Sequence, residues 1–328
     1  MSSPRRRAHL AALALLALVT TACAGGQEDP PPEAGTSGSS GSPSGQGATA
    51  APDADPGSAD PRALPRVARA VSARQVARQI LAAETAIADP ATSGRQLRRA
   101  AQVQQLAYRV LGTRPGWDDA VYAELPPRLH AAVRDNVAAR REFRSMHSTL
   151  SDTLPAWRIV APAPAADLKR FYREAESVHG VGWEYLAAIN LVETAMGRSR
   201  GTSVAGAQGP MQFIPTTWAR WGRGDINDPA DAIMAAARYL ASSGFARGPR
   251  GVADALYAYN NHPAYVRGVT AYARVMERRP RAFLGYHQWD VYYLTDQGDV
   301  VLPVGYERNR PVPVRRYLAS QSARQAQP

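Results

Sequence analysis

Apolar side chains recur at intervals of three and four residues through much of this chain, and that spacing limits the folds open to it more than any other feature. The pattern fills residues 63–88, ALPRVARAVSARQVARQILAAETAIA, and residues 93–112, SGRQLRRAAQVQQLAYRVLG. It returns in residues 167–180, DLKRFYREAESVHG, and in residues 181–197, VGWEYLAAINLVETAMG. Such a period places the apolar residues on one face of an α-helix. The sequence therefore predicts a mainly α protein.

Proline and glycine interrupt this pattern at three places. GTRPGW at residues 112–117 and LPP at residues 125–127 are predicted to separate helices, and residues 155–166 form a connector rich in Pro and Ala. Near the C-terminus the pattern changes, because two runs typical of β-strands, residues 291–295 and 300–304, flank the turn sequence DQGD. We expect a β-hairpin there.

The N-terminus has the features of an export signal. Three consecutive arginines precede a mostly apolar run at residues 8–19, which is shorter than the roughly 20 residues of a membrane-spanning helix. Cys23 follows it and is the single cysteine of the chain, so no intramolecular disulfide is possible. Its position resembles that of the lipid-modified cysteine in a bacterial lipoprotein signal. We expect a protein anchored through Cys23 to the outer face of the cytoplasmic membrane, with cleavage and secretion as the alternative.

Residues 24–61 consist of Gly, Ser, Pro, Ala and other small or polar residues, without a large hydrophobic side chain. Such a segment cannot bury enough apolar surface to fold, and we expect a disordered linker. The whole chain has 39 Lys and Arg against 28 Asp and Glu, a formal net charge of +11. This charge indicates either attraction to anionic polymers and lipid headgroups of the envelope or a general preference for Arg. Nucleic acid is not an expected partner, because the chain is predicted to be exported and has no nucleic-acid-binding motif.

Glu193 is an isolated carboxylate in the apolar stretch NLVETAMGRSRGTSVAGAQGPMQF, residues 190–213, and the next acidic residue is Asp225. Helical geometry places three apolar residues on its face, namely Leu186, Ile189 and Met196. Burial there would raise the pKa of the carboxyl, as a general acid near neutral pH requires. The alternative is a structural Glu bonded to the backbone at the edge of the core. Glu184 is expected on the opposite, solvated side of the same helix.

Four sequence blocks, in this order and spacing, resemble those of the lytic transglycosylases, relatives of goose-type lysozyme. They are ETAMG at 193–197, GPMQFIPTT at 209–217, DINDPADAI at 225–233 and AYNNHPAYV at 258–266. The resemblance covers residues 168–276. The last two blocks are most similar to the membrane-bound lytic transglycosylase B branch. The resemblance implies a lysozyme-like catalytic domain with Glu193 as its catalytic residue.

The implied reaction is cleavage of the β-1,4 bond between MurNAc and GlcNAc in peptidoglycan, with formation of a 1,6-anhydro-MurNAc end. In such enzymes one Glu acts first as acid and then as base, which is a recognised exception to the use of two carboxylates. Two alternatives stay open. One is a hydrolytic muramidase of the same fold, and the other is a wall-binding protein without catalytic activity.

The resemblance also implies substrate-binding residues. Gln212 is expected to hydrogen-bond sugar or peptide groups, and Tyr259 and Asn260 to orient Glu193 or the N-acetyl group of the substrate. The other expected members of the site lie in the GPMQF block: Gly209, Met211 and Phe213. As an alternative, the apolar members belong to the core, and Tyr259 and Asn260 tie two helices together.

No metal and no cofactor are expected. Asp225, Asp228 and Asp231 resemble part of a calcium loop, but the segment is short and lacks the alternating ligands and terminal Glu of a full EF-hand. Asp228 before Pro229 is typical of a helix N-cap. The expected partners are peptidoglycan glycan strands and, through Cys23, a membrane, and the protein is expected to be a monomer.

Together these predictions divide the chain into five parts. Residues 1–23 are a lipoprotein-type signal peptide, residues 24–61 a linker and residues 62–160 a helical accessory region. Residues 161–280 form the catalytic domain, and residues 281–328 the β-hairpin and tail.

Overall fold

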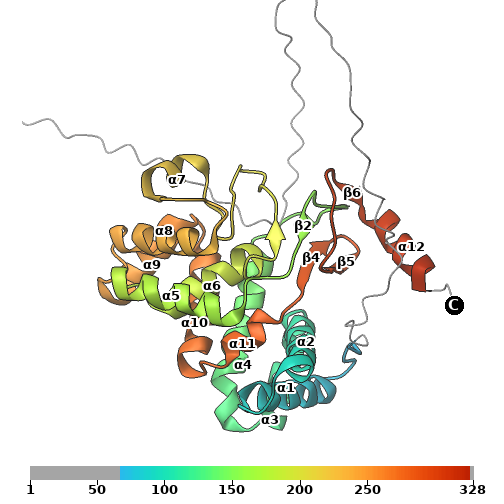
Figure 1. Cartoon of the computed structure of the whole chain (residues 1–328). Coiled ribbons are helices and arrows are strands. Elements are labelled where there is room, and N and C mark those ends of the chain that lie inside the picture. Colours follow the sequence, from blue (N-terminus) through green and yellow to red (C-terminus); the bar gives the residue numbers. More distant parts are fainter. Residues whose placement is uncertain (1–66, 326–328) are drawn as a thin grey trace, which may run out of the picture. The chain divides into compact units, whose positions relative to one another are not determined.

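The structure is a computed structural model that describes residues 67–325 (Figure 1). The predicted signal peptide, Cys23 and the linker at residues 24–61 lie outside the described residues. Lipidation and export therefore stay predictions. Across the described part of the chain, no helix combines the length and the apolar character that crossing a membrane requires.

The first helices follow the predicted pattern and its breaks. They are α1 (Ala73–Ala88), α2 (Gly94–Gly112), the 3₁₀ turn η1 (Pro115–Trp117), α3 (Asp118–Glu124) and α4 (Pro127–Ser145). α1 begins later than the apolar pattern does, because the hydroxyl of Ser72 caps it by accepting a hydrogen bond from the backbone N–H of Gln75. Pro127 is the first residue of α4, where its missing N–H has no cost.

The second group of helices contains the sequence blocks described above. Its members are α5 (Ala165–His179), α6 (Trp183–Thr194), α7 (Pro215–Trp221), α8 (Pro229–Ser242), α9 (Gly248–Tyr259), α10 (Pro263–Arg278), α11 (Ala282–His287) and α12 (Val314–Gln325). α5 ends where predicted, at Gly180, which has a φ of +69°. α12 lies in the predicted tail and extends through its polar residues as far as Gln325.

The described residues contain three antiparallel pairs of short strands, of which one is a local hairpin and two join distant parts of the chain. The predicted hairpin is present as β4 (Val291–Thr295) and β5 (Gly298–Leu302). Its second strand begins earlier than predicted, because Thr295 pairs with Gly298 and leaves a two-residue turn. The other pairs were not predicted: β1 (Thr153–Leu154) with β6 (Val312–Pro313), and β2 (Arg158–Ile159) with β3 (Ser199–Arg200).

The two groups of helices share one hydrophobic core. α10 packs against α4 from the first group and against α6 from its own, and α11 packs against α2. A single cluster of buried residues extends from Val76 and Leu111 to Leu186 and Val269. The described part of the region predicted as accessory, residues 67–160, is therefore packed directly onto the helices that carry the sequence blocks.

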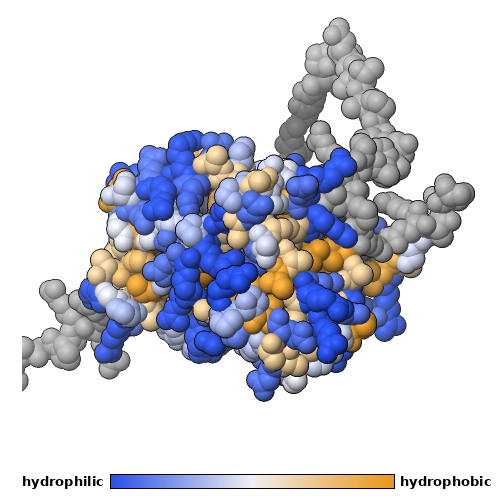
Figure 2. Space-filling view, turned by 90° about the horizontal axis from the view of Figure 1, so that it is seen from below, coloured by the Kyte–Doolittle hydropathy of each residue, from blue (hydrophilic) through white to orange (hydrophobic). Residues whose placement is uncertain are grey.

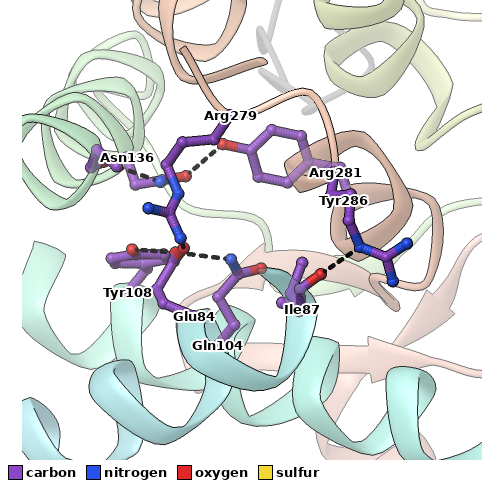
Figure 3. A network of polar contacts seen from close by, with 9 residues as sticks. Glu84, Ile87, Gln104, Tyr108, Asn136, Arg279, Arg281 and Tyr286 are labelled. Carbon is purple, nitrogen blue, oxygen red and sulfur yellow. Dashed lines mark hydrogen bonds and ion pairs between the residues drawn. The ribbon is translucent and has the colours of Figure 1, made fainter. Parts of the chain in front are cut away.

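Buried polar contacts reinforce this packing (Figure 3). Glu84 of α1 is 1% exposed and accepts hydrogen bonds from Tyr108 at 2.6 Å and from Gln104 at 2.8 Å. Arg279, which follows α10, forms an ion pair with Glu84 at 3.4 Å. Tyr286 of α11 donates a hydrogen bond of 2.7 Å to Asn136 of α4. Each of the last two contacts crosses between the groups and fixes their relative position.

The surface gives no sign of a single large apolar face. Figure 2 shows one side of the molecule, on which hydrophilic residues are interspersed with smaller hydrophobic groups. The exposed large hydrophobic residues are distributed along the described chain rather than along one helix: Val71, Val178, Val204, Tyr257, Val301, Val304 and Leu318.

Candidate active site

Glu193 lies in the last turn of α6 and is 3% exposed. The three residues predicted to share its face, Leu186, Ile189 and Met196, are all buried. Glu184 at the start of the helix is half-buried rather than solvated. α6 is therefore enclosed on more sides than its sequence pattern indicates. Glu184 is less buried than Glu193, but it is not fully exposed to solvent.

The carboxyl group of Glu193 has one hydrogen-bond donor. The hydroxyl of Tyr265 on α10 donates to Oε1 at 2.8 Å, whereas Oε2 is buried without a hydrogen-bond partner among the described residues. Burial raises the pKa of Glu193 to about 8, and the bond from Tyr265 lowers it by a smaller amount. The group therefore holds its proton near neutral pH, on a carboxyl that has one oxygen free to meet a ligand.

The chain turns sharply directly after this carboxylate. Ala195, Met196 and Gly197 have φ values of 52°, 63° and 80°, a left-handed run that costs about 1 kcal/mol or more for each non-glycine residue. Thr194 supports the turn, because its hydroxyl accepts a hydrogen bond of 3.0 Å from the backbone N–H of Gly197. Glu193 is thus held at a helix end where the backbone moves away from it.

The GPMQF loop is fixed to α6 and α9 through its backbone. The carbonyl of Pro210 accepts hydrogen bonds from Asn190 at 2.8 Å and from Thr194 at 2.6 Å. The carbonyl of Met211 accepts one of 2.7 Å from the hydroxyl of Tyr259. The loop therefore has a defined position relative to the helix that carries Glu193.

Within this loop Gly209 and Gln212 have left-handed backbones, with φ values of 73° and 50°. A Cβ at Gly209 would overlap the backbone carbonyl of Ile226, so only glycine fits. The side-chain amide of Gln212 donates to the Gly209 carbonyl at 2.9 Å, and its Oε1 is buried without a partner among the described residues. Gln212 thus has one polar atom available for a ligand.

Met211, Phe213 and Tyr259 belong to the core. Met211 is fully buried, Phe213 is 3% exposed, and the Phe213 ring packs edge-on against Trp218 and Tyr259. These contacts correspond to the packing alternative stated for them above. Asn260 is also buried and is the C-cap residue of α9.

A cavity of about 130 Å³ lies beside Glu193. Its other walls come from regions that the sequence did not connect with this residue: Gln105 and Arg109 of α2, Arg140 and Phe143 of α4, and Trp289 and Tyr292 at the hairpin. A second hollow of about 170 Å³ is lined by Gly209 and Asn227, and Ser199 borders both. The two hollows therefore share one lining residue, and the second of them lies at the GPMQF loop.

Asp290 brings a second carboxylate to the first cavity, which spacing along the chain did not reveal. Its Oδ2 accepts a hydrogen bond of 3.0 Å from Gln102. Glu193 is alone in its part of the sequence, but it shares its cavity with this acid.

Comparison with known proteins agrees with the sequence blocks. Residues 170–280 match the family described as Transglycosylase SLT domain. A curated protein of Thiobacillus denitrificans (strain ATCC 25259 / T1), Membrane-bound lytic murein transglycosylase F, is 28% identical over 153 residues. That alignment covers 45% of this chain but only 32% of the relative, so the chain matches about a third of the relative's length. No solved structure matches the chain.

These matches confirm the predicted resemblance to lytic transglycosylases and the mainly α, lysozyme-like class of fold. They do not distinguish the B branch, which stays a prediction. Glu193, the GPMQF loop and Tyr265 all lie inside the matched SLT domain. Arg109 and Arg140 lie outside it. The cavity beside Glu193 is therefore built jointly by the matched region, by the helices before it and by the hairpin segment after it.

Tyr265 is the residue of the SLT domain that sequence reasoning missed. It lies within the AYNNHPAYV block, but 72 residues separate it from Glu193. Its ring stacks on that of Tyr259 with 6.3 Å between centroids, so Tyr259 supports the donor instead of bonding the carboxylate itself. His262 caps the start of α10, because its Nδ1 accepts a hydrogen bond of 3.1 Å from the backbone N–H of Ala264. This cap helps to define the position of Tyr265 in the first turn of the helix.

The acidic segment before α8 is used for capping. Asp228 accepts hydrogen bonds from the backbone N–H groups of Ala230 at 2.8 Å and Asp231 at 3.0 Å, which confirms the predicted N-cap. Asp231 in turn accepts from the N–H of Asp225 at 2.8 Å. Among residues 67–325 no group of three or more His, Cys, Asp or Glu side chains is arranged to hold a metal ion.

Proposed function

We propose that this protein is a peptidoglycan lytic transglycosylase that cleaves the β-1,4 bond between MurNAc and GlcNAc and leaves a 1,6-anhydro-MurNAc end. The observation that carries the proposal is Glu193, a buried carboxyl with a pKa of about 8 and a free oxygen, at a cavity of an SLT domain. A protonated carboxyl near neutral pH is what protonation of a glycosidic oxygen requires.

The reaction needs one acid that is used twice. Glu193 gives its proton to the glycosidic oxygen as the bond to C1 of MurNAc breaks, and the N-acetyl carbonyl of the substrate stabilises the positive charge at C1. The Glu193 carboxylate then takes the proton of the C6 hydroxyl as that oxygen attacks C1. The proton that Glu193 gave stays on the leaving hydroxyl, the carboxyl is restored by the proton of the C6 hydroxyl, and no water is consumed. The hydroxyl of Tyr265 stabilises the carboxylate between the two steps.

The predicted binding residues have different parts in this proposal. Gln212 offers its free Oε1 to an N–H or hydroxyl of the substrate. Gly209 borders the second hollow and holds the loop backbone close to a bound sugar. Three of the remaining four position the loop: Met211, Phe213 and Tyr259. The fourth, Asn260, is proposed to orient the N-acetyl group.

The proposed location is the cell envelope, where the substrate lies. A lipid on Cys23 and a linker at residues 24–61 would let the folded part reach glycan strands away from the membrane. We propose that the protein acts as a monomer, and that residues 161–280 form its catalytic domain.

Asp290 favours one alternative, a hydrolytic muramidase in which this second carboxylate activates a water molecule. Replacing Asp290 by Asn separates the two mechanisms, because a hydrolase with two acids loses most of its rate. The transglycosylase keeps most of its rate, because Asp290 has no part in its proton transfers. The released fragments are quantified by chromatography, and a melting curve checks that the variant is folded.

The cleavage activity itself is tested on purified sacculi with the full-length protein. We expect soluble glycan fragments to appear with time. If the protein sediments with sacculi but releases nothing, the wall-binding alternative is correct and the enzymatic proposal is rejected.

Replacing Tyr265 by Phe is expected to move the high-pH limit of activity upward. The hydroxyl lowers the pKa of Glu193, so its removal raises this pKa further above about 8. The acid must be protonated when the reaction starts, and activity falls as the pH rises through its pKa. The pH profile of kcat/KM on soluble glycan strands measures the limit. Tyr286→Phe, which removes a buried hydroxyl bonded to Asn136, is the control and should leave the limit in place. A limit that moves downward in Tyr265→Phe would contradict this assignment.

A further inference from the structure

The cavity beside Glu193 has a positively charged wall that the cleavage chemistry does not use. Arg109 and Arg140 both line this cavity, from two helices that precede the SLT domain in the chain. Arg109 is buried and Arg140 is partly buried with its Nε fully enclosed, whereas other arginines of the same helices are exposed: Arg95, Arg128, Arg134 and Arg144. The position of these two beside a candidate active site therefore needs its own explanation.

Arg109 is held rigidly and its charge is compensated. It is 7% exposed and forms an ion pair with Asp299 of β5, at 2.6 Å between Nη2 and Oδ1. Its Nε donates to the other carboxylate oxygen at 2.8 Å, and its guanidinium lies 4.1 Å from the ring centroid of Tyr292. This arrangement engages one face and one edge of the guanidinium group, so Arg109 forms a fixed part of the wall.

Arg140 has no such partner. Its Nε is buried without a hydrogen-bond partner among the described residues, and none of their ion pairs includes it. A buried donor on a charged group is costly unless an acceptor reaches it. Arg140 is also close enough to Arg109 that its charge contributes to lowering the pKa of Arg109. An anion in the cavity accepts a hydrogen bond from Arg140 and reduces the repulsion between the two positive charges.

The carboxylates near this wall are already engaged. Asp299 pairs with Arg109, and Asp290 accepts a hydrogen bond from Gln102 and interacts electrostatically with Arg198. Glu193 holds its proton near neutral pH and supplies no compensating charge there. None of these carboxylates forms an ion pair with Arg140, so a ligand can supply the anion that matches it.

We propose that Arg140, with Arg109 beside it, binds a carboxylate of the glycan next to the bond that Glu193 cleaves, and so selects strands that contain lactyl ethers over plain GlcNAc polymers. The inference rests on the proposed function and names a specificity determinant within it. The planar guanidinium group of arginine can donate two parallel hydrogen bonds to the two oxygens of one carboxylate. In MurNAc the lactyl group ends in a carboxyl that is free in strands without peptide stems. In intact strands it forms an amide with a stem that has carboxylates of its own.

The test measures binding to full-length protein with Glu193→Gln, so that ligands are not cleaved. Three probes are compared: chitohexaose, strands freed of stems by an amidase, and strands with intact stems. We expect Arg140→Gln to weaken binding of at least one carboxylate-bearing strand about tenfold, the usual effect of losing one charge-assisted hydrogen bond. Chitohexaose should bind unchanged. Arg140→Lys should restore part of the affinity, and Arg134→Gln, an exposed arginine on the same helix, should have no effect.

The pattern across probes identifies the source of the carboxylate. A loss confined to strands without stems assigns it to the lactyl group, and a loss confined to intact strands assigns it to the stem. A uniform loss on all probes, chitohexaose included, or no loss on any of them overturns the inference while leaving the proposed function in place. If the parent protein binds none of the probes and the wild type releases nothing from sacculi, the proposed function fails, and the inference fails with it. Melting curves of each variant exclude unfolding as the cause.

Discussion

Replacing Glu193 by Gln is expected to lower the rate of glycan cleavage by about 10³- to 10⁴-fold, the upper range for loss of a general acid or base. The amide keeps the shape of the carboxyl and can still accept the hydrogen bond from Tyr265. It can neither donate the proton to the glycosidic oxygen nor take it back from the C6 hydroxyl. Because one residue performs both transfers, no second group is left to perform either. Initial rates of fragment release from sacculi measure the effect.

Glu184→Gln is the matched control, because it makes the same change on the same helix at a half-buried position. It should retain close to the wild-type rate. The Glu193→Gln variant should still sediment with sacculi, since the substitution leaves the walls of the cavity intact. A Glu193→Gln variant that keeps most of the wild-type rate would remove this residue from the mechanism.

Gly209→Ala is expected to destabilise the protein by about 2 to 5 kcal/mol and to reduce activity strongly. Gly209 has a φ of +73°, where an alanine is strained, and its Cβ would overlap the backbone carbonyl of Ile226. The backbone must move to make room, and the loop it belongs to is bonded to the helix of Glu193 through Pro210. Chemical denaturation gives the free energy of unfolding, and sacculus digestion gives the activity.

Gly206→Ala separates the effect of backbone strain from the effect of the overlap with the Ile226 carbonyl. Gly206 has a φ of +80° in the same loop, but a Cβ there meets nothing within 4 Å. Only the backbone strain applies, so the loss should be about 1 kcal/mol with activity retained. Equal losses at both positions would show that the contact with Ile226 does not limit residue 209.

Local signals in the sequence predicted the local features of this fold. The spacing of apolar residues defined the helices, Gly180 marked the end of α5, and Asp228 with Pro229 marked the start of α8. Each of these depends on residues within one or two turns of each other, which a linear pattern records. The apolar face of Glu193 was predictable for the same reason.

Contacts between distant segments were not predictable in this way. Tyr265 reaches Glu193 only because α10 packs against α6. Arg140 and Asp290 reach the same cavity because α4 packs on α10 and the hairpin segment lies beside α2. In the sequence, Arg140 looks the same as the exposed arginines on its helix. The burial of Met211 and Phe213 likewise depends on partners in α7 and α9.

Glu193 is proposed to cleave the glycan without water, and the chemical ends of the products distinguish this reaction from hydrolysis. Purified sacculi are digested with the full-length protein, and the released fragments are analysed by mass spectrometry without prior reduction. We expect fragments that end in 1,6-anhydro-MurNAc, each lighter by one water molecule than the corresponding hydrolysis product. Fragments that end in reducing MurNAc would contradict this proposal and would identify the protein as a hydrolase.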